Sequence, residues 1–254
     1  MRKEIFFTIE VNSSNGGKMY KESITNIFKE RVIEVKEFKA ENDANSKVES
    51  IIYEAMNIYV SRLMTGYFEL GLEATFQLHF SRILEDLLLV NTVQENERYQ
   101  VLLEKNLPLD DNKNYVDIVI KHKIDNQEYL YLIELKYKKI TDSATDLGNI
   151  MSYIDMFNLE CHKKTNTVKG CYFIFLTDLQ TYVNEPKKGT RTEVPMHDNY
   201  TIKKDKTYNV QNESAKKAMG RFLQNGFTFS SNHKIEYTHF KIDEKDYWYF
   251  IEKI

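Results

Sequence analysis

The sequence has few cysteines and prolines and no long apolar run, and each scarcity excludes a class of protein. Its 254 residues include two cysteines, Cys161 and Cys171, and three prolines. Two cysteines at this spacing give no disulfide framework and no metal-binding motif, which favours a reduced setting. No stretch approaches the roughly 18 apolar residues of a membrane helix. The apolar start of the chain is interrupted at Thr8 and Glu10, too early for a signal peptide. We therefore expect a soluble, cytoplasmic protein with no membrane partner.

Internal repeats, low-complexity tracts and linkers are also missing, and no Gly-x-x-x-x-Gly-Lys-Ser/Thr phosphate loop indicates an ATPase. The hydrophobic content of 42% can bury a substantial core at this length. We expect a single α/β domain over residues 1–254. It would have an N-terminal helical part at about 1–66, a core at about 67–180, and a C-terminal basic loop with strands at 181–254.

The charge is distributed unevenly along the chain. The net charge is −3, which by itself does not suggest a nucleic-acid binder. Residues 161–217, however, contain eleven Lys and Arg against six Asp and Glu. Lysines often only cover solvated faces, so this excess is compatible with nucleic acid without requiring it.

Hydrophobic periodicity predicts a mixed α/β order. Apolar residues at helical spacing predict helices over 46–64 and about 68–90, separated at Gly66, and a third over about 143–159. Runs rich in β-branched and aromatic residues predict strands at 115–122 and 129–137, joined by a turn at Asp125 and Asn126. The continuous apolar run at 170–178 predicts a buried strand. Two further strands are expected around a turn at 243–245.

The predicted hairpin carries charges among its apolar residues. Strand side chains alternate between faces, so Glu134 and Lys136 share one face and Leu135 takes the other. If Asp117 lies opposite them on the neighbouring strand, two carboxylates and an ammonium meet in one small patch. Burying them costs several kcal/mol unless something compensates, and a divalent cation would do so. The alternative is a solvated face with an ordinary surface ion pair.

The helix at 68–90 places a second acid in an apolar setting. At 100° per residue, Glu73 falls near the centre of the arc formed by Leu72, Phe76, Phe80 and the following leucines. Ionised carboxylates are rarely buried without a partner. A core lysine or a position at the helix start would also explain it. Gln77 lies at the edge of the same arc. In the helix at 143–159, Asn149 and Tyr153 are four residues apart and share a face.

This ordered set resembles the PD-(D/E)xK nuclease superfamily, which has the restriction-endonuclease-like fold. The resemblance rests on Glu73, on Asp117, on Glu134-Leu135-Lys136 and on the helix that follows, and it covers roughly residues 68–178. Val116 stands where the proline of the family name would be. Asn149 and Tyr153 resemble the Gln-x-x-x-Tyr helix of the exonuclease-type branch, with Asn in place of Gln.

The resemblance implies a restriction-endonuclease-like mixed β-sheet core flanked by helices, and a role for each residue. Asp117, Glu134 and Glu73 would bind Mg²⁺, which Mn²⁺ could replace. Lys136 would hold or polarise the attacking water, so that Asp117, Glu134 and Lys136 form the catalytic set. Supporting roles fall to Asn149, Tyr153 and Gln77. DNA is the implied partner, a homodimer is allowed, and the phosphate contacts are expected from Lys138, Lys163, Lys164, Lys187, Lys188 and Arg191.

The resulting expectation is a Mg²⁺-dependent DNA endonuclease, either a type II restriction enzyme or a related defence nuclease. Two alternatives stay open. One is a repair, transposition or recombination nuclease that is structure-specific or exonucleolytic. The other is a catalytically silent nucleic-acid-binding module of the same fold, with its charges paired internally.

Overall fold

The structure, a computed structural model, describes residues 44–92, 95–109, 113–139, 145–186, 194–209 and 226–254. All of these residues belong to one compact unit, Glu37–Ile254. The N-terminal helical part expected at 1–66 is therefore described from residue 44 onward, and the inclusion of residues 1–43 in the same domain stays a prediction.

Two helices precede the sheet, as the apolar spacing predicted. Helix α1 spans Ala44–Met64 and α2 spans Glu73–Val90. The apolar residues at helical spacing in α1 are buried, namely Val48, Ile51, Ile52, Ala55, Met56, Tyr59 and Leu63. Gly66 ends α1 with a φ of 69°, where its N–H and that of Tyr67 donate to carbonyls of the last helical turn. Glycine tolerates this left-handed conformation, which explains why the helix stops here.

A six-stranded mixed sheet forms the centre of the unit, in the order β1-β2-β3-β4-β10-β9. The strands β3 and β4 are parallel and all other neighbours are antiparallel. Helix α3, Thr145–Lys163, connects the parallel pair. The strand bounds are β1 Glu97–Asn106, β2 Tyr115–Ile124, β3 Gln127–Lys138, β4 Val168–Thr177, β9 Thr238–Ile242 and β10 Lys245–Lys253.

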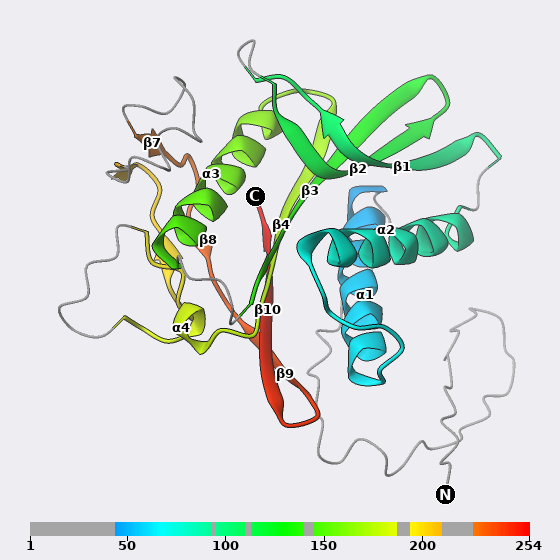
Figure 1. The fold of residues 1–254 in the computed structure, drawn as a ribbon. Coiled ribbons are helices and arrows are strands. Elements are labelled where there is room, and N and C mark those ends of the chain that lie inside the picture. The colour runs from blue at the N-terminus through cyan, green and yellow to red at the C-terminus, as the bar shows by residue number, and fades with distance from the viewer. Residues whose placement is uncertain (1–43, 93–94, 110–112, 140–144, 187–193, 210–225) are drawn as a thin grey trace, which may run out of the picture. The chain divides into compact units, whose positions relative to one another are not determined.

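Helices cover both faces of this sheet (Figure 1). Helix α3 packs on β3 and β4 on one side, while α2 packs on β1, β2 and β3 on the other, with α1 beside it. This two-sided cover explains why β4 is buried along nearly its whole length and lacks the alternation of a half-exposed strand. The continuous apolar run had predicted such a buried strand.

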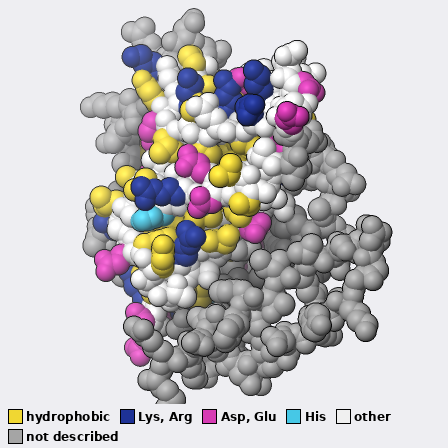
Figure 2. All heavy atoms as spheres, turned by 90° about the vertical axis from the view of Figure 1, so that its right-hand side faces the viewer, with side chains coloured by type: hydrophobic (Ala, Val, Ile, Leu, Met, Phe, Trp, Pro, Cys, Tyr) yellow, Lys and Arg dark blue, Asp and Glu magenta, His cyan; other side chains and the backbone are white. Residues whose placement is uncertain are grey.

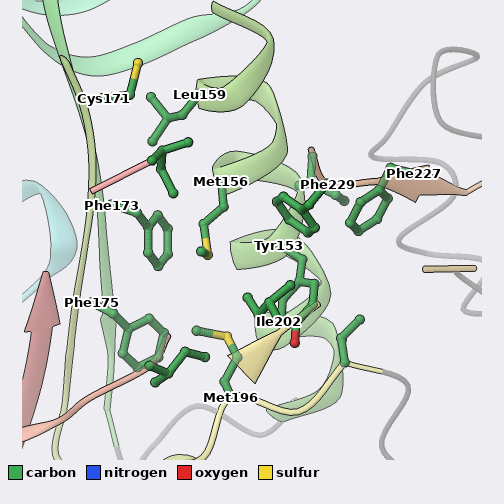
Figure 3. Close-up of a cluster of buried hydrophobic side chains, with 14 of the residues drawn as sticks. Tyr153, Met156, Leu159, Cys171, Phe173, Phe175, Met196, Ile202, Phe227 and Phe229 are labelled. Atoms are coloured by element: carbon green, nitrogen blue, oxygen red, sulfur yellow. The ribbon is translucent and has the colours of Figure 1, made fainter. Parts of the chain in front are cut away.

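The main core lies between the sheet and α3 and continues to the far side of that helix (Figure 3). Phe173 and Phe175 of β4 face Met156 and Leu159 of α3. Beyond α3, aromatic residues of the C-terminal third pack against Tyr153. That third also contains a short helix and two small ladders, β5 with β8 and β6 with β7. Their bounds are α4 Gln180–Val183, β5 Thr201–Ile202, β6 Thr207–Tyr208, β7 Phe227–Thr228 and β8 His233–Lys234.

The fold is therefore α/β, with a mixed six-stranded sheet flanked by helices, as the coarse prediction stated. Strand β1 was not predicted, and neither was α4, which falls in a segment that we expected to be loop. None of the helices in the described ranges has the length and apolar character that crossing a membrane requires.

Candidate active site

The strands β2 and β3 separate at one end and leave a fork in the sheet. Their pairing runs from the turn to Ile118, which lies opposite Ile133. Beyond this point β2 continues to pair only with β1, and β3 only with β4. The N–H groups of Leu135 and Tyr137 then have no carbonyl of β2 to bind. Backbone N–H groups in such a position need another acceptor.

Two carboxylates take the place of the missing strand partner. The N–H of Leu135 donates to Oδ2 of Asp117 at 2.7 Å. The N–H of Tyr137 donates to Oε2 of Glu73, the first residue of α2, at 2.9 Å. The fork thus fixes acids from two separate elements along the edge of β3.

Gln77 ties α2 to the other side of the fork, one turn after Glu73. Its side-chain amide donates to the backbone carbonyl of Asp117 at 2.8 Å and to Oε1 of Glu104 at 3.0 Å. Glu104 belongs to β1 and was not singled out from the sequence. The supporting residue predicted at position 77 therefore does lie beside the predicted acids.

Glu134 is buried with 5% of its surface exposed, so the solvated surface ion pair considered as an alternative is wrong. Its carboxyl group shares a hydrogen bond with that of Asp117. Burial first, and then the negative charges of Asp155 and Asp117, hold the pKa of Glu134 well above its usual range. Burial likewise raises the pKa of Asp117, although Lys136 opposes this rise.

Lys136 is the ammonium group at the centre of these acids. Its Nζ lies 2.9 Å from Oδ2 of Asp155 and 3.8 Å from Oε1 of Glu73. Burial alone would lower the pKa of Lys136, but the surrounding carboxylates outweigh burial and raise it. The side chain is therefore a protonated hydrogen-bond donor and not a base at neutral pH. Both alternatives considered for Glu73 apply, because it is the first residue of α2 and it lies near Lys136.

Asp155 is the site residue that the sequence patterns missed. It lies on α3, and helical geometry puts it on the same face as Gly148 and Ser152, which is toward β3. Asn149 and Tyr153 lie on a different face. Tyr153 is fully buried and donates to the carbonyl of Pro195, so it is part of the core and does not lie at the carboxylates.

Asn149 is also buried, and its Oδ1 has no hydrogen-bond partner among the residues that the structure describes. The structure therefore supports the predicted side-by-side placement of Asn149 and Tyr153 on the helix but does not bring Tyr153 to the cluster.

The basic residues expected to contact DNA are distributed unequally. Lys138 lies beside the start of α3, where a Cβ at Gly148 would come within 3.3 Å of its Cε. Lys163 donates to the backbone oxygen of Ile254. It and Lys164 lie at the far end of α3, roughly 12 Å along the helix from Asp155. The remaining three, Lys187, Lys188 and Arg191, lie outside the described residues.

The molecular surface around α2 does not show one sign of charge. Figure 2 shows basic, acidic and apolar side chains intermixed on the face that lies to the right in Figure 1. The described part of this face therefore carries no uniformly positive surface.

The donor set suits a hard divalent cation. Glu73, Asp117 and Glu134 supply only carboxylate oxygens, the ligands that Mg²⁺ prefers. The charges of four carboxylates act on a single ammonium, so the acids of the cluster outnumber its base, while burial is the main cause of the raised pKa of Glu134 and Asp117. Within the described ranges no three His, Cys, Asp or Glu side chains are already arranged as a metal site. The excess of negative charge is the observation that makes a cation fit.

Comparison of the chain with family models, curated proteins and solved structures gives no match.

Proposed function

We propose that this protein is a Mg²⁺-dependent deoxyribonuclease that hydrolyses phosphodiester bonds, with its active site at the fork between β2 and β3. One observation carries the proposal: acids from α2, β2 and β3 lie beside a largely buried lysine where β2 and β3 separate. A structural ion pair needs one acid for one base, whereas this cluster has an excess of acids. The mixed sheet and its covering helices are compatible with a restriction-endonuclease-like core.

Each residue has a task in this proposal. Asp117, Glu134 and Glu73 would hold the cation, and the two strand N–H groups keep Asp117 and Glu73 in place. The cation would supply positive charge against the phosphate and favour deprotonation of the attacking water. Lys136, which stays protonated, would donate a hydrogen bond to that water or to a phosphate oxygen as negative charge develops.

The first experiment tests cleavage. The purified chain is incubated with Mg²⁺ or Mn²⁺ and with closed-circular, linear and branched DNA. We expect cleavage that falls at least about 100-fold in Lys136→Ala and in Asp117→Asn. Lys121→Ala is the matched control, because Lys121 forms a surface pair with Glu128 away from the fork. Wild-type cleavage by either site variant would refute the assignment.

The products also separate the biological roles. Discrete fragments from unmethylated phage DNA would indicate a site-specific restriction or related defence nuclease. A smear, or a preference for ends or branches, would indicate a repair, transposition or recombination nuclease.

A silent binding module is the second candidate, and the pair between Lys136 and Asp155 favours it, because it neutralises part of the cluster internally. Calorimetry with Mn²⁺ separates the two. Heat of binding that disappears in Asp117→Asn supports the nuclease, and no binding by the wild-type protein supports the silent module.

A further inference from the structure

Asp155 pairs with the lysine of the site from helix α3. Lys136 Nζ is 2.9 Å from its carboxylate, against 3.8 Å for Glu73. The side chains of Asp155 and Lys136 are both 16% exposed, so water screens this pair only partly. Asp155 is therefore the principal partner of the ammonium group.

The fold fixes Asp155 firmly. Its helix is anchored by the core on one face and by the hydrogen bond from Tyr153 to Pro195 on another. Along the face toward β3, the buried Ser152 hydroxyl donates to the carbonyl of Gly148. The absence of a side chain at Gly148 leaves room for the Tyr182 hydroxyl and, next to it, for the Lys138 side chain. Asp155 is thus presented to β3 by a rigid helix and not by a loop.

The lysine has a choice of anionic partners. Asp117, Glu134 and Glu73, which we assign to the cation, all lie close enough to act on its charge. An ammonium group drawn toward these three acids would fill the space that the cation needs and would neutralise part of the negative charge that attracts it. Asp155 belongs to α3, a different element from the three, and its charge also acts on Glu134 and Asp117.

We propose that Asp155 is a positioning residue, which retains the Lys136 ammonium on the α3 side of the fork and keeps it from competing with the cation. This inference rests on the proposed function. Asp155 acts through Lys136 and is not itself a ligand of the cation. Because both partners come from rigid elements, the lysine stays beside the attacking water and outside the cation's coordination space.

The test is a double-mutant cycle on cation affinity. Mn²⁺ binding is measured by calorimetry for wild type, Asp155→Asn, Lys136→Met and the double variant. We expect Asp155→Asn to weaken binding about tenfold when Lys136 is present, because the released lysine competes. In the Lys136→Met background the same change should weaken binding less than about threefold, which is the through-space effect of one charge.

Either of two results would overturn the inference. An equal loss in both backgrounds would make Asp155 a ligand or a purely structural residue, and no loss in either would leave it without a role. Cleavage gives a second readout, because Asp155→Glu should retain most of the rate that Asp155→Asn loses, with KM for DNA unchanged in both.

A cation-free arm keeps the inference testable if the wild-type protein binds no Mn²⁺. The melting temperatures of the same four proteins are then compared in chelator. If Asp155 engages Lys136 in solution, the double variant shifts less than the two single shifts added together. Additive shifts would reject the pairing itself, whereas non-additive shifts without Mn²⁺ binding would reject only the nuclease proposal.

Discussion

Two glutamates of the same sheet are buried equally and behave in opposite ways. Glu97 is 4% exposed and Glu134 is 5% exposed. Burial would raise the pKa of both. At Glu97, hydrogen bonds from Tyr99 and Lys47 outweigh burial and lower the pKa. At Glu134, Asp155 and Asp117 add to burial and raise it. Burial alone therefore does not decide the direction of a pKa shift, and the hydrogen bonds and charges of the neighbours do.

The clusters around Glu97 and Glu134 differ in the charges of their neighbours. The Glu97 carboxylate is 3.1 Å from Lys47 Nζ, 2.7 Å from the Tyr99 hydroxyl and 3.2 Å from Nε2 of His122. Lys47 balances its charge, and Lys47 and Tyr99 donate hydrogen bonds to its oxygens, whereas burial lowers the pKa of His122, whose ring nitrogens have no hydrogen-bond partner among the described residues. The fork cluster has more acid than base, which costs stability in the free protein. Such uncompensated cost is common at functional sites.

The largest effect expected from this comparison is at Glu97. Glu97→Gln removes the charge that Lys47 and His122 face, so it should lower the free energy of unfolding by about 2–3 kcal/mol, toward the low end for breaking a buried pair. Urea denaturation measures this. Glu128→Gln, which breaks an exposed pair with Lys121, is the control and should cost below about 1 kcal/mol. Equal effects at the two positions would contradict the contrast.

A smaller effect of opposite sign is expected at Glu134. In the presence of chelator, Glu134→Gln removes one of the crowded like charges and should raise the free energy of unfolding by about 1–2 kcal/mol. The same variant should lose cation-dependent cleavage. Destabilisation by Glu134→Gln in chelator would show that the cluster is already balanced, and the comparison with Glu97 would fail.

The smallest effect is on pH dependence. The pKa of Glu97 is lowered from 4.5, so its stabilisation is complete above that value and is lost as the pH falls through the folded-state pKa. The pKa of Glu134 is raised from 4.5, so stability is greatest below that value and is lost as the pH rises toward the folded-state pKa.

Thermal melts in chelator check these opposite trends. The melting temperatures of wild type and Glu97→Gln should approach each other as the pH falls below 4.5. The melting temperatures of wild type and Glu134→Gln should move apart as the pH rises above 4.5. Asp117 titrates together with Glu134, so the second trend belongs to the pair. Parallel trends for the two variants would contradict the assignment of opposite environments.

Local patterns predicted most of the fold. The hairpin was visible because two β-rich runs flank a turn at Asp125, whose φ of 53° suits Asp or Asn. Apolar spacing located α1, α2 and α3, and the continuous apolar run located β4. Strand β1 was missed because Val101, Leu102 and Leu103 are consecutive and do not alternate, and only its pairing with β2 makes it a strand.

Local patterns also predicted part of the site. Strand alternation put Glu134 with Lys136, whereas the burial that helical angles predicted for Glu73 is wrong, because its side chain is 41% exposed at the start of α2. Asp155 could not be found this way, because helical spacing gives the face of a residue but not the strand that this face meets. The shared helix face of Asn149 and Tyr153 was predicted correctly. The sequence did not show that Tyr153 on this face packs against the aromatic core.

The fork has a consequence for how the site can be observed. The amide hydrogens of Leu135 and Tyr137 each bind a carboxylate at a position where, in a continuous sheet, they would bind a carbonyl of the next strand. Their hydrogen-exchange rates therefore report directly on whether the acids are seated. These two amide hydrogens can thus follow the assembly of the site without substrate or turnover.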